Sequence, residues 1–362
     1  MKKKISLLLL AIIPFFTQAQ FGGLLGKVKN KVNDKVNQRV DNKIDKTINK
    51  TLDKAEGKET AGSQEASSTS GPADEKASIK SISKYDFVPG EKVVYAEDFS
   101  QDATGELPLN WNTNGSGEVV RLEKFTGEWL QVHNPFTYLT SNTTELTENY
   151  TAEFDLILQL KNNGWMYPTF SCGFFATNGE PGTDNVFLKD YNKYAAVAAT
   201  ISPAEYKGSR VTLESFTDAK KYFKSEDKVY SDLENYYGKP VHVAIQVQQQ
   251  RFRMWINETK VFDVPKGIDT VYKMNQLFFK VGATNYKEDQ YAIYLGHIKA
   301  ATGLPDTRHK LIEEGKFSTT GILFDLNSAV IQPASSGVVK EIADVLKENP
   351  SVKIKVIGHT SS

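Results

Sequence analysis

Glu153 and Asp155 are the two side chains whose spacing best suits acid–base chemistry. Alternate residues of a β-strand point to one face, so both carboxylates would lie opposite the apolar side chains of Ala152, Phe154 and Leu156. Two carboxyl groups on one face can divide the roles of proton donor and nucleophile only if both flank the bond to be broken. The same alternation is typical of a half-buried strand with solvent-facing acids, and we prefer this structural interpretation.

The remaining residue types with reactive chemistry show no grouping. Cys172 is the only cysteine and lies in an apolar run from 170 to 175, which predicts a buried thiol and excludes an intrachain disulfide. His242 falls on the polar face of its strand, which predicts a position at the surface. The five histidines have no metal-ligand spacing: His133, His242, His297, His309 and His359. The sequence therefore predicts no catalytic residues, no metal and no cofactor.

The N-terminus has the pattern of an export signal. Three lysines after Met1 precede the short apolar stretch 5–16, and Ala19 ends a plausible cleavage site, so 1–19 is predicted to be a signal peptide. Its removal lowers the net charge from 0 to −3, which is no signature of nucleic-acid binding. Because no cysteine stands at the boundary, we expect an exported chain without a lipid anchor.

Residues 20–56 form a basic tract with apolar residues four apart. Nine basic and four acidic residues lie between 27 and 54. A four-residue step overshoots one helical turn by about 40°, so the apolar stripe winds around the helix and a heptad coiled coil fits poorly. A right-handed supercoil, a helix on an anionic membrane surface and a marginal solvated helix remain open. Residues 57–84 have almost no large apolar residues and predict a disordered linker.

From 85 to 303 the sequence predicts a mainly β domain. Short alternating runs are separated by Gly, Asn, Asp and Pro, with only a weak helical pattern around Asp218 to Tyr230. Many short strands over about 215 residues indicate a two-sheet sandwich. The predicted strands are 93–99, 151–160, 169–177, 195–202, 210–216, 241–247, 252–256, 276–281 and 291–298.

After a linker at 304–316, residues 317–362 read as β-α-β. An apolar run at 321–328 precedes a helical pattern that ends at Asn349-Pro350, and Val352, Ile354 and Val356 then alternate with lysines. The I-x-F-D-x-N-S-x-x-I-x-P opening and the Gly-His-Thr close resemble the OmpA-like peptidoglycan-binding domain. The resemblance covers about 45 residues, which implies the first part of an α/β module.

That resemblance implies a grip on the diaminopimelate peptides of peptidoglycan. The family uses an aspartate after Gly-His-Thr and an arginine further on, which together hold the ammonium and carboxylate groups. Here Asn327, His359 and Thr360 match the pocket, whereas Ser361 replaces the aspartate and the arginine would lie beyond Ser362. The expected site is therefore incomplete.

The β domain resembles the concanavalin A-like jelly-roll sandwiches of lectins and laminarinase-type glycosidases. The resemblance rests on 97–100 with 107–111, on 151–156, and on 242–264 with its hairpin at 255–261. Glycosidases of this fold use an E-x-D-x-x-E strand, but Leu158 stands where the second glutamate would supply the general acid. Exposed aromatic rings could stack on sugars, and candidates in loop-like segments are Trp111, Trp129, Trp165, Tyr167, Tyr236 and Tyr237.

Together these patterns predict a non-enzymatic OmpA-family protein exported to the periplasm or outer membrane of a Gram-negative envelope. Its last segment would anchor on peptidoglycan, its sandwich would present a glycan- or protein-binding surface, and residues 27–54 would contact a membrane or self-associate. The alternative is a carbohydrate-binding or glycoside-hydrolase-like jelly-roll protein in which the sandwich is the active part.

Overall fold

The computed structural model describes residues 85–304, 306–324, 328 and 330–358. By its internal contacts the chain divides into two compact units, Met1–Ser78 and Ile79–Ser362, and every described residue belongs to the second. The predicted signal peptide, basic tract and linker up to 84 lie outside the described residues. No helix among the described residues is long and apolar enough to cross a membrane.

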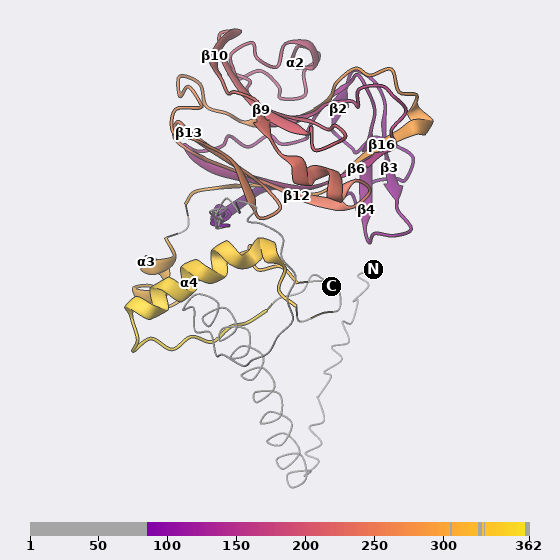
Figure 1. Ribbon diagram of the computed structural model, residues 1–362. Helices are drawn as coiled ribbons and strands as arrows, with labels where there is room; N and C mark the ends of the chain where they lie inside the picture. Colours follow the sequence, from indigo (N-terminus) through magenta and orange to yellow (C-terminus); the bar gives the residue numbers. More distant parts are fainter. Residues whose placement is uncertain (1–84, 305, 325–327, 329, 359–362) are drawn as a thin grey trace, which may run out of the picture. The chain divides into compact units, whose positions relative to one another are not determined.

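Two antiparallel sheets form the body of the described unit (Figure 1). We name them sheet A and sheet B. In sheet A the order is β14-β13-β12-β6-β16-β4-β3, with β1 also paired to β16. The bounds are β1 Lys92–Glu97, β3 Gly117–Arg121, β4 Glu128–Val132, β6 Asn149–Leu160, β12 Pro240–Gln248, β13 Arg251–Ile256, β14 Thr259–Val264 and β16 Tyr291–Thr302.

Sheet B has the order β10-β9-β8-β7-β15-β5-β2, with β11 also paired to β9. Its bounds are β2 Asn112–Thr113, β5 Thr137–Leu139, β7 Phe170–Ala176, β8 Ala195–Ser202, β9 Arg210–Thr217, β10 Lys220–Lys224, β11 Lys228–Val229 and β15 Gln276–Val281. The prediction of a mainly β, two-sheet sandwich is therefore confirmed.

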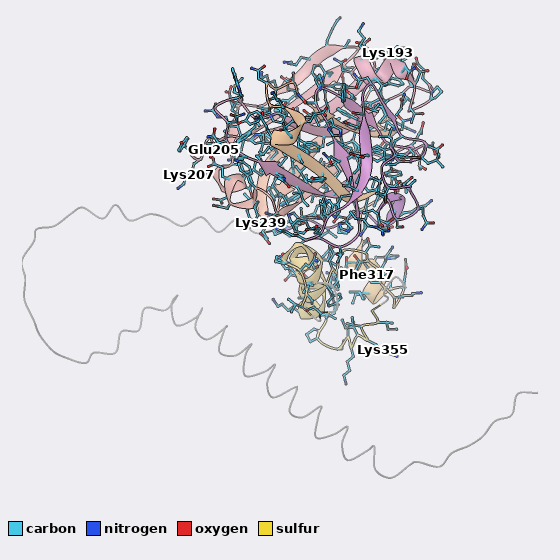
Figure 2. All side chains as sticks on the ribbon, turned by 90° about the vertical axis from the view of Figure 1, so that its right-hand side faces the viewer. Lys193, Glu205, Lys207, Lys239, Phe317 and Lys355 are labelled. Carbon is cyan, nitrogen blue, oxygen red and sulfur yellow. The ribbon has the colours of Figure 1, made fainter. Side chains whose placement is uncertain are left out.

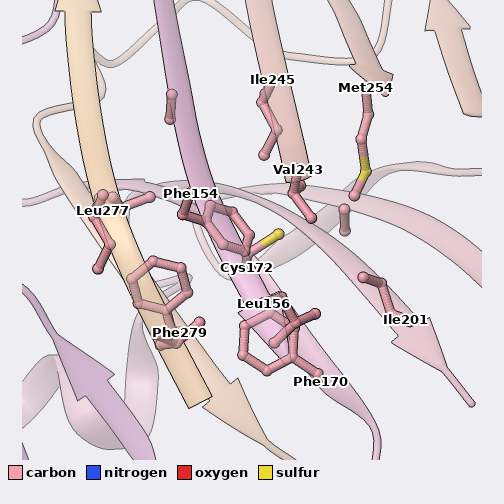
Figure 3. Close-up of a cluster of buried hydrophobic side chains, with 14 of the residues drawn as sticks. Phe154, Leu156, Phe170, Cys172, Ile201, Val243, Ile245, Met254, Leu277 and Phe279 are labelled. Carbon is pink, nitrogen blue, oxygen red and sulfur yellow. The ribbon is translucent and has the colours of Figure 1, made fainter. Parts of the chain in front are cut away.

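The core lies between the sheets and follows from the alternation in the sequence. Phe154 and Leu156 of β6 and Val243 of β12 point inward, and the buried Phe170 and Cys172 of β7 meet them from sheet B (Figure 3). Removing such apolar surface from water contributes roughly 25 cal/mol per Å². Burial also raises the pKa of the Cys172 thiol to about 12. The predicted burial of Cys172 is confirmed.

The outer face of sheet B is covered by a short helix that the sequence pattern did not reveal. α2 (Asn185–Asp190) begins at Asp184, whose carboxylate accepts a hydrogen bond from the Val186 N–H. Its Phe187 packs on Phe175 of β7, with the ring centroids 4.8 Å apart. Six residues were too few to produce a helical apolar period that could be recognised.

The weak helical pattern around Asp218 to Tyr230 was wrong. Asp218 and Ala219 both have positive φ (49° and 57°), the backbone of a tight hairpin turn, and the chain returns as β10 against β9. Lys228 and Val229 then pair with β9 as β11. Charged residues on these strands are exposed because this is an edge of sheet B.

The segment after the sandwich contains two helices, α3 (Thr307–Ile312) and α4 (Ser336–Glu348). α4 lies where the sequence predicted a helix, and Val338 and Val345 on one of its faces are buried. The two predicted flanking strands are wrong among the described residues. Phe324 forms only an isolated bridge with Ile331, and 352–358 pair with no strand. An extended segment without a neighbouring strand leaves its N–H and C=O groups unpaired. The α/β module is thus not formed by the described residues.

The remaining elements are short. They are the 3₁₀ turns η1 (Ser231–Tyr236), η2 (Glu288–Gln290) and η3 (Pro333–Ser335).

Candidate functional site

An open cleft of about 760 Å³ lies on the outer face of sheet A. Its floor includes Glu153 and Asp155 of β6, His242 of β12 and His297 of β16. Pairing explains the grouping, because β6 runs between β12 and β16, and Asp155 lies opposite both His242 and Gly296. Outward-facing residues of three neighbouring strands therefore meet at one place.

Asp155 is hydrogen-bonded to two imidazole rings. Its Oδ1 lies 2.9 Å from His242 Nδ1, and its Oδ2 lies 2.9 Å from His297 Nδ1. Burial disfavours ionisation of Asp155, but the hydrogen bonds and charges of both histidines outweigh burial and hold its pKa below the usual range. Asp155 is therefore a fixed carboxylate that orients both rings.

His242 is the cation between two carboxylates. Its Nε2 lies 3.4 Å from Glu153 Oε2, a charge pair without the alignment of a hydrogen bond. Burial disfavours the imidazolium, yet the interactions with Asp155 and Glu153 prevail and raise the His242 pKa well above its ordinary value. The prediction that His242 lies on the polar face holds, but its side chain is mostly buried under the walls of the cleft.

His297 reaches the cleft because β16 bulges. The pairing with β6 shifts between Gly296 and Lys299, and His297 adopts a φ of 52°. A bulge re-aims one side chain and disturbs the ladder locally. The His297 side chain is 49% exposed and is the most accessible member of the polar group. Its role was missed from the sequence, although an isolated glycine within a strand is a recognised signal for a bulge.

Trp129 supports His297 from β4. Its ring meets the imidazole edge-on, with centroids 5.5 Å apart and an interplanar angle of 80°. Gly296 makes this possible, because a Cβ there would lie 2.9 Å from the Trp129 ring. The wall continues with Phe125, whose ring centroid is 6.2 Å from that of Trp129. The cleft thus combines a polar floor with an aromatic wall.

The rim of the cleft carries charges of both signs. Glu97 is the last residue of β1 and Asp98 follows it, while Lys124 and Lys299 lie on other parts of the lining. Asp98 accepts a hydrogen bond from the Ser100 N–H at 3.0 Å, and bonding to Ser100 lowers its pKa. Burial raises the pKa of Glu97. Across floor and rim the charges nearly balance, so the cleft has no strong preference for an ion.

Glu153 and Asp155 are arranged differently from the two carboxyl groups of a glycosidase. Glu153 and Asp155 do share the outer face, but Asp155 is held by two histidines and Leu158 is buried in the sandwich core. Within the described residues no group of three or more His, Cys, Asp or Glu side chains could hold a metal ion. Asn327, His359, Thr360 and Ser361, the predicted peptidoglycan contacts, lie outside the described residues.

Most of the aromatic candidates for sugar stacking are core residues. Trp111, Trp129 and Tyr167 are buried, and Tyr236 and Tyr237 pack against the core. Trp165 is the exception, with 57% of its surface exposed. Ring exposure could not be read from composition, because a ring in a loop can still fold back onto the core.

No protein-family model matches the chain, and no curated protein matches it significantly. Among solved structures, a Bacillus subtilis protein of unknown function with a galectin-like fold is 12% identical with a TM-score of 0.42, over 60% of this chain and 98% of that one. The carbohydrate recognition domain of Emp47p is 10% identical with a TM-score of 0.40, over 59% and 98%. The carbohydrate-binding module CBM66 from Bacillus subtilis is 13% identical with a TM-score of 0.34, over 55% and 100%. Because sequence identities and TM-scores this low carry no functional argument, we infer the function from the geometry of the cleft.

Proposed function

We propose that the sandwich is a jelly-roll-type carbohydrate-binding domain and that the cleft on sheet A is its binding site. The main observation that supports this proposal is the polar floor of an open cleft of about 760 Å³, which is formed by Glu153, Asp155, His242 and His297. A binding pocket of this size range holds a small ligand and orients it with a few placed polar groups. Sugar hydroxyls both donate and accept hydrogen bonds, and they suit a floor of carboxylates beside imidazoles.

Preorganisation supports binding by this floor. Asp155 fixes both rings, and Asn257 Oδ1 accepts a hydrogen bond from the backbone N–H of His242 at 3.0 Å. Side chains already held in place lose little conformational entropy when a ligand arrives. His297 is the most accessible side chain of this polar floor, so we expect it to be the main direct contact.

We propose binding without hydrolysis. Asp155 is ionised and engaged on both oxygens, and Leu158 contributes no carboxyl group to the outer face. A glycosidase of the two-carboxylate type needs a protonated acid over the leaving oxygen. The proposed floor contains no such arrangement of two free carboxyl groups, and it therefore suits recognition rather than bond cleavage.

A glycan microarray with the whole chain tests this proposal. We expect binding to a restricted set of neutral glycans, and His297→Ala to weaken that binding at least about tenfold, the loss of one well-placed contact. His309→Ala, a half-exposed histidine of α3 outside the cleft, is the matched control and leaves binding unchanged. Equal binding by wild type and His297→Ala, or no glycan bound at all, would falsify the cleft as the site.

Anchoring on peptidoglycan is the second candidate, favoured by one observation. α4 forms at Ser336–Glu348, where the resemblance to the OmpA-like domain places a helix. We expect sedimentation with purified peptidoglycan if this segment acts as an anchor. Retention unchanged in His297→Ala but lost in Thr360→Ala would separate the anchor from the cleft, and no retention of the whole chain would reject it.

A further inference from the structure

A second exposed feature lies on the loops between β6 and β7 and between β8 and β9. Trp165, Met166 and Tyr206 are 57%, 88% and 92% exposed, although large apolar side chains are usually withdrawn from water. We call these three side chains the apolar tip. None of them lines the cleft on sheet A.

The apolar tip is held rigidly from beneath. Thr284 Oγ1 donates to the Met166 carbonyl at 2.7 Å, and Tyr286 Oη donates to the Trp165 carbonyl at 3.3 Å. Tyr167 Oη donates to Glu205 and ties the first loop to the second. These hydrogen bonds tie both loops to the sandwich and to each other beneath the three exposed side chains.

The second loop holds its tip residue in a costly backbone conformation. Tyr206 and Lys207 have φ values of 58° and 61°, in the left-handed region that favours glycine. The turn is closed by a hydrogen bond from the Gly208 N–H to the Glu205 carbonyl at 3.1 Å. A strained turn that points an aromatic ring into water is the kind of feature that persists at functional positions.

The charges and side-chain types of the two loops indicate what kind of surface the apolar tip contacts. The charged residues of these two loops are Lys161, Lys207 and Glu205, and Glu205 is turned toward Tyr167. Among the described residues neither lysine forms an ion pair, and Figure 2 shows Lys207 beside Glu205 at the edge of the molecule. Exposed cations beside a Trp–Met–Tyr group match a membrane surface, where amphipathic rings sit at headgroup level and lysines meet phosphates.

Other occupants fit less well. Even at full exposure the three side chains together would offer less than the roughly 800 Å² that each partner buries in a stable protein interface. Met166 is flexible and has no flat ring on which a sugar could stack, whereas it fits readily among lipid chains. We infer that the apolar tip docks shallowly on a phospholipid surface that carries anionic headgroups.

Tryptophan fluorescence offers a direct test, because Trp165 is exposed while the other three of the four tryptophans are buried. With vesicles of phosphatidylcholine and phosphatidylglycerol, we expect a blue shift of Trp165 emission and quenching when the lipids carry bromine on their acyl chains. Trp165→Phe should abolish both signals. Quenching of Trp165 reports contact between the apolar tip and the lipid. Vesicle binding without this quenching, as expected if residues 27–54 alone bind the vesicles, would overturn the inference.

The double variant Met166→Ser/Tyr206→Ser should reduce the bromolipid quenching of Trp165 at least about fivefold. Leu109→Ser, which removes a side chain 76% exposed on another loop, is the matched control and leaves quenching unchanged. An unaltered thermal midpoint verifies that each variant is folded. Quenching of Trp165 by soluble oligosaccharide without vesicles, or quenching in the double variant equal to that in the wild type, overturns the lipid assignment. Loss of glycan binding at the cleft does not affect this assignment.

Discussion

The outer face of sheet B and the centre of the outer face of sheet A are built in opposite ways. On sheet B, Phe175 and Phe278 are covered by Phe187 and Leu188 of α2, and that part of the surface is apolar and closed. On sheet A, the centre of the face carries Asp155 and its two histidines beneath an open cleft. A closed apolar face stabilises the fold, whereas charges held away from water stabilise it little. The polar face is therefore where function is expected.

The largest effect should come from the closed face. Phe175→Ala removes a fully buried ring that packs on Phe187, and we expect the free energy of unfolding to fall by about 4 kcal/mol. Denaturant titration measures this loss, while glycan affinity of the folded fraction should be unchanged. Phe175→Leu, which keeps most of the volume, should cost much less. A loss below about 1 kcal/mol in Phe175→Ala would show that α2 adds little to sheet B.

On the polar face, Asp155→Ala should cost about 3 kcal/mol of unfolding free energy. The change leaves the His242 imidazolium without its principal partner, and removing one member of a buried pair is costly; partial exposure of Asp155 reduces the figure. Unlike Phe175→Ala, it should also abolish glycan binding, because His297 loses its orientation. In a double-mutant cycle with His242→Ala, strictly additive losses would contradict the coupling of these two residues.

A pH dependence of stability is expected from the polar face and not from the closed face. The His242 pKa rises from 6.5 to about 10 on folding, so its stabilisation is fully present below pH 6.5, declines above that pH, and is gone above about pH 10. Unfolding free energy measured from pH 6 to 10 should decrease more in wild type than in His242→Gln. A parallel decrease in both proteins would assign the effect to other groups.

The sequence reveals single strands well and their neighbours poorly. The alternation at 151–160 predicted that Glu153 and Asp155 share a face, and the alternation at 241–247 placed His242 on a polar face; both predictions hold. That β12 and β16 flank β6 depends on sheet order over more than a hundred residues, which no local pattern encodes.

His297 shows most clearly why the site could not be assembled from the sequence. In a regular strand it would alternate with its neighbours, but the bulge at Gly296 rotates it into the cleft. The helix α4 was predicted correctly because thirteen residues carry a full apolar period, while the strands beside it failed because a strand needs a partner that a local pattern cannot supply.

The buried position of Cys172 has a practical consequence for labelling. The chain has a single thiol, and it lies at the centre of the core where burial raises its pKa to about 12. A thiol in that state reacts slowly with maleimides and other alkylating reagents at neutral pH. A cysteine introduced beside the cleft or at the apolar tip would therefore take up a fluorophore or spin label selectively. Both proposed surfaces can be followed in this way in an otherwise native chain.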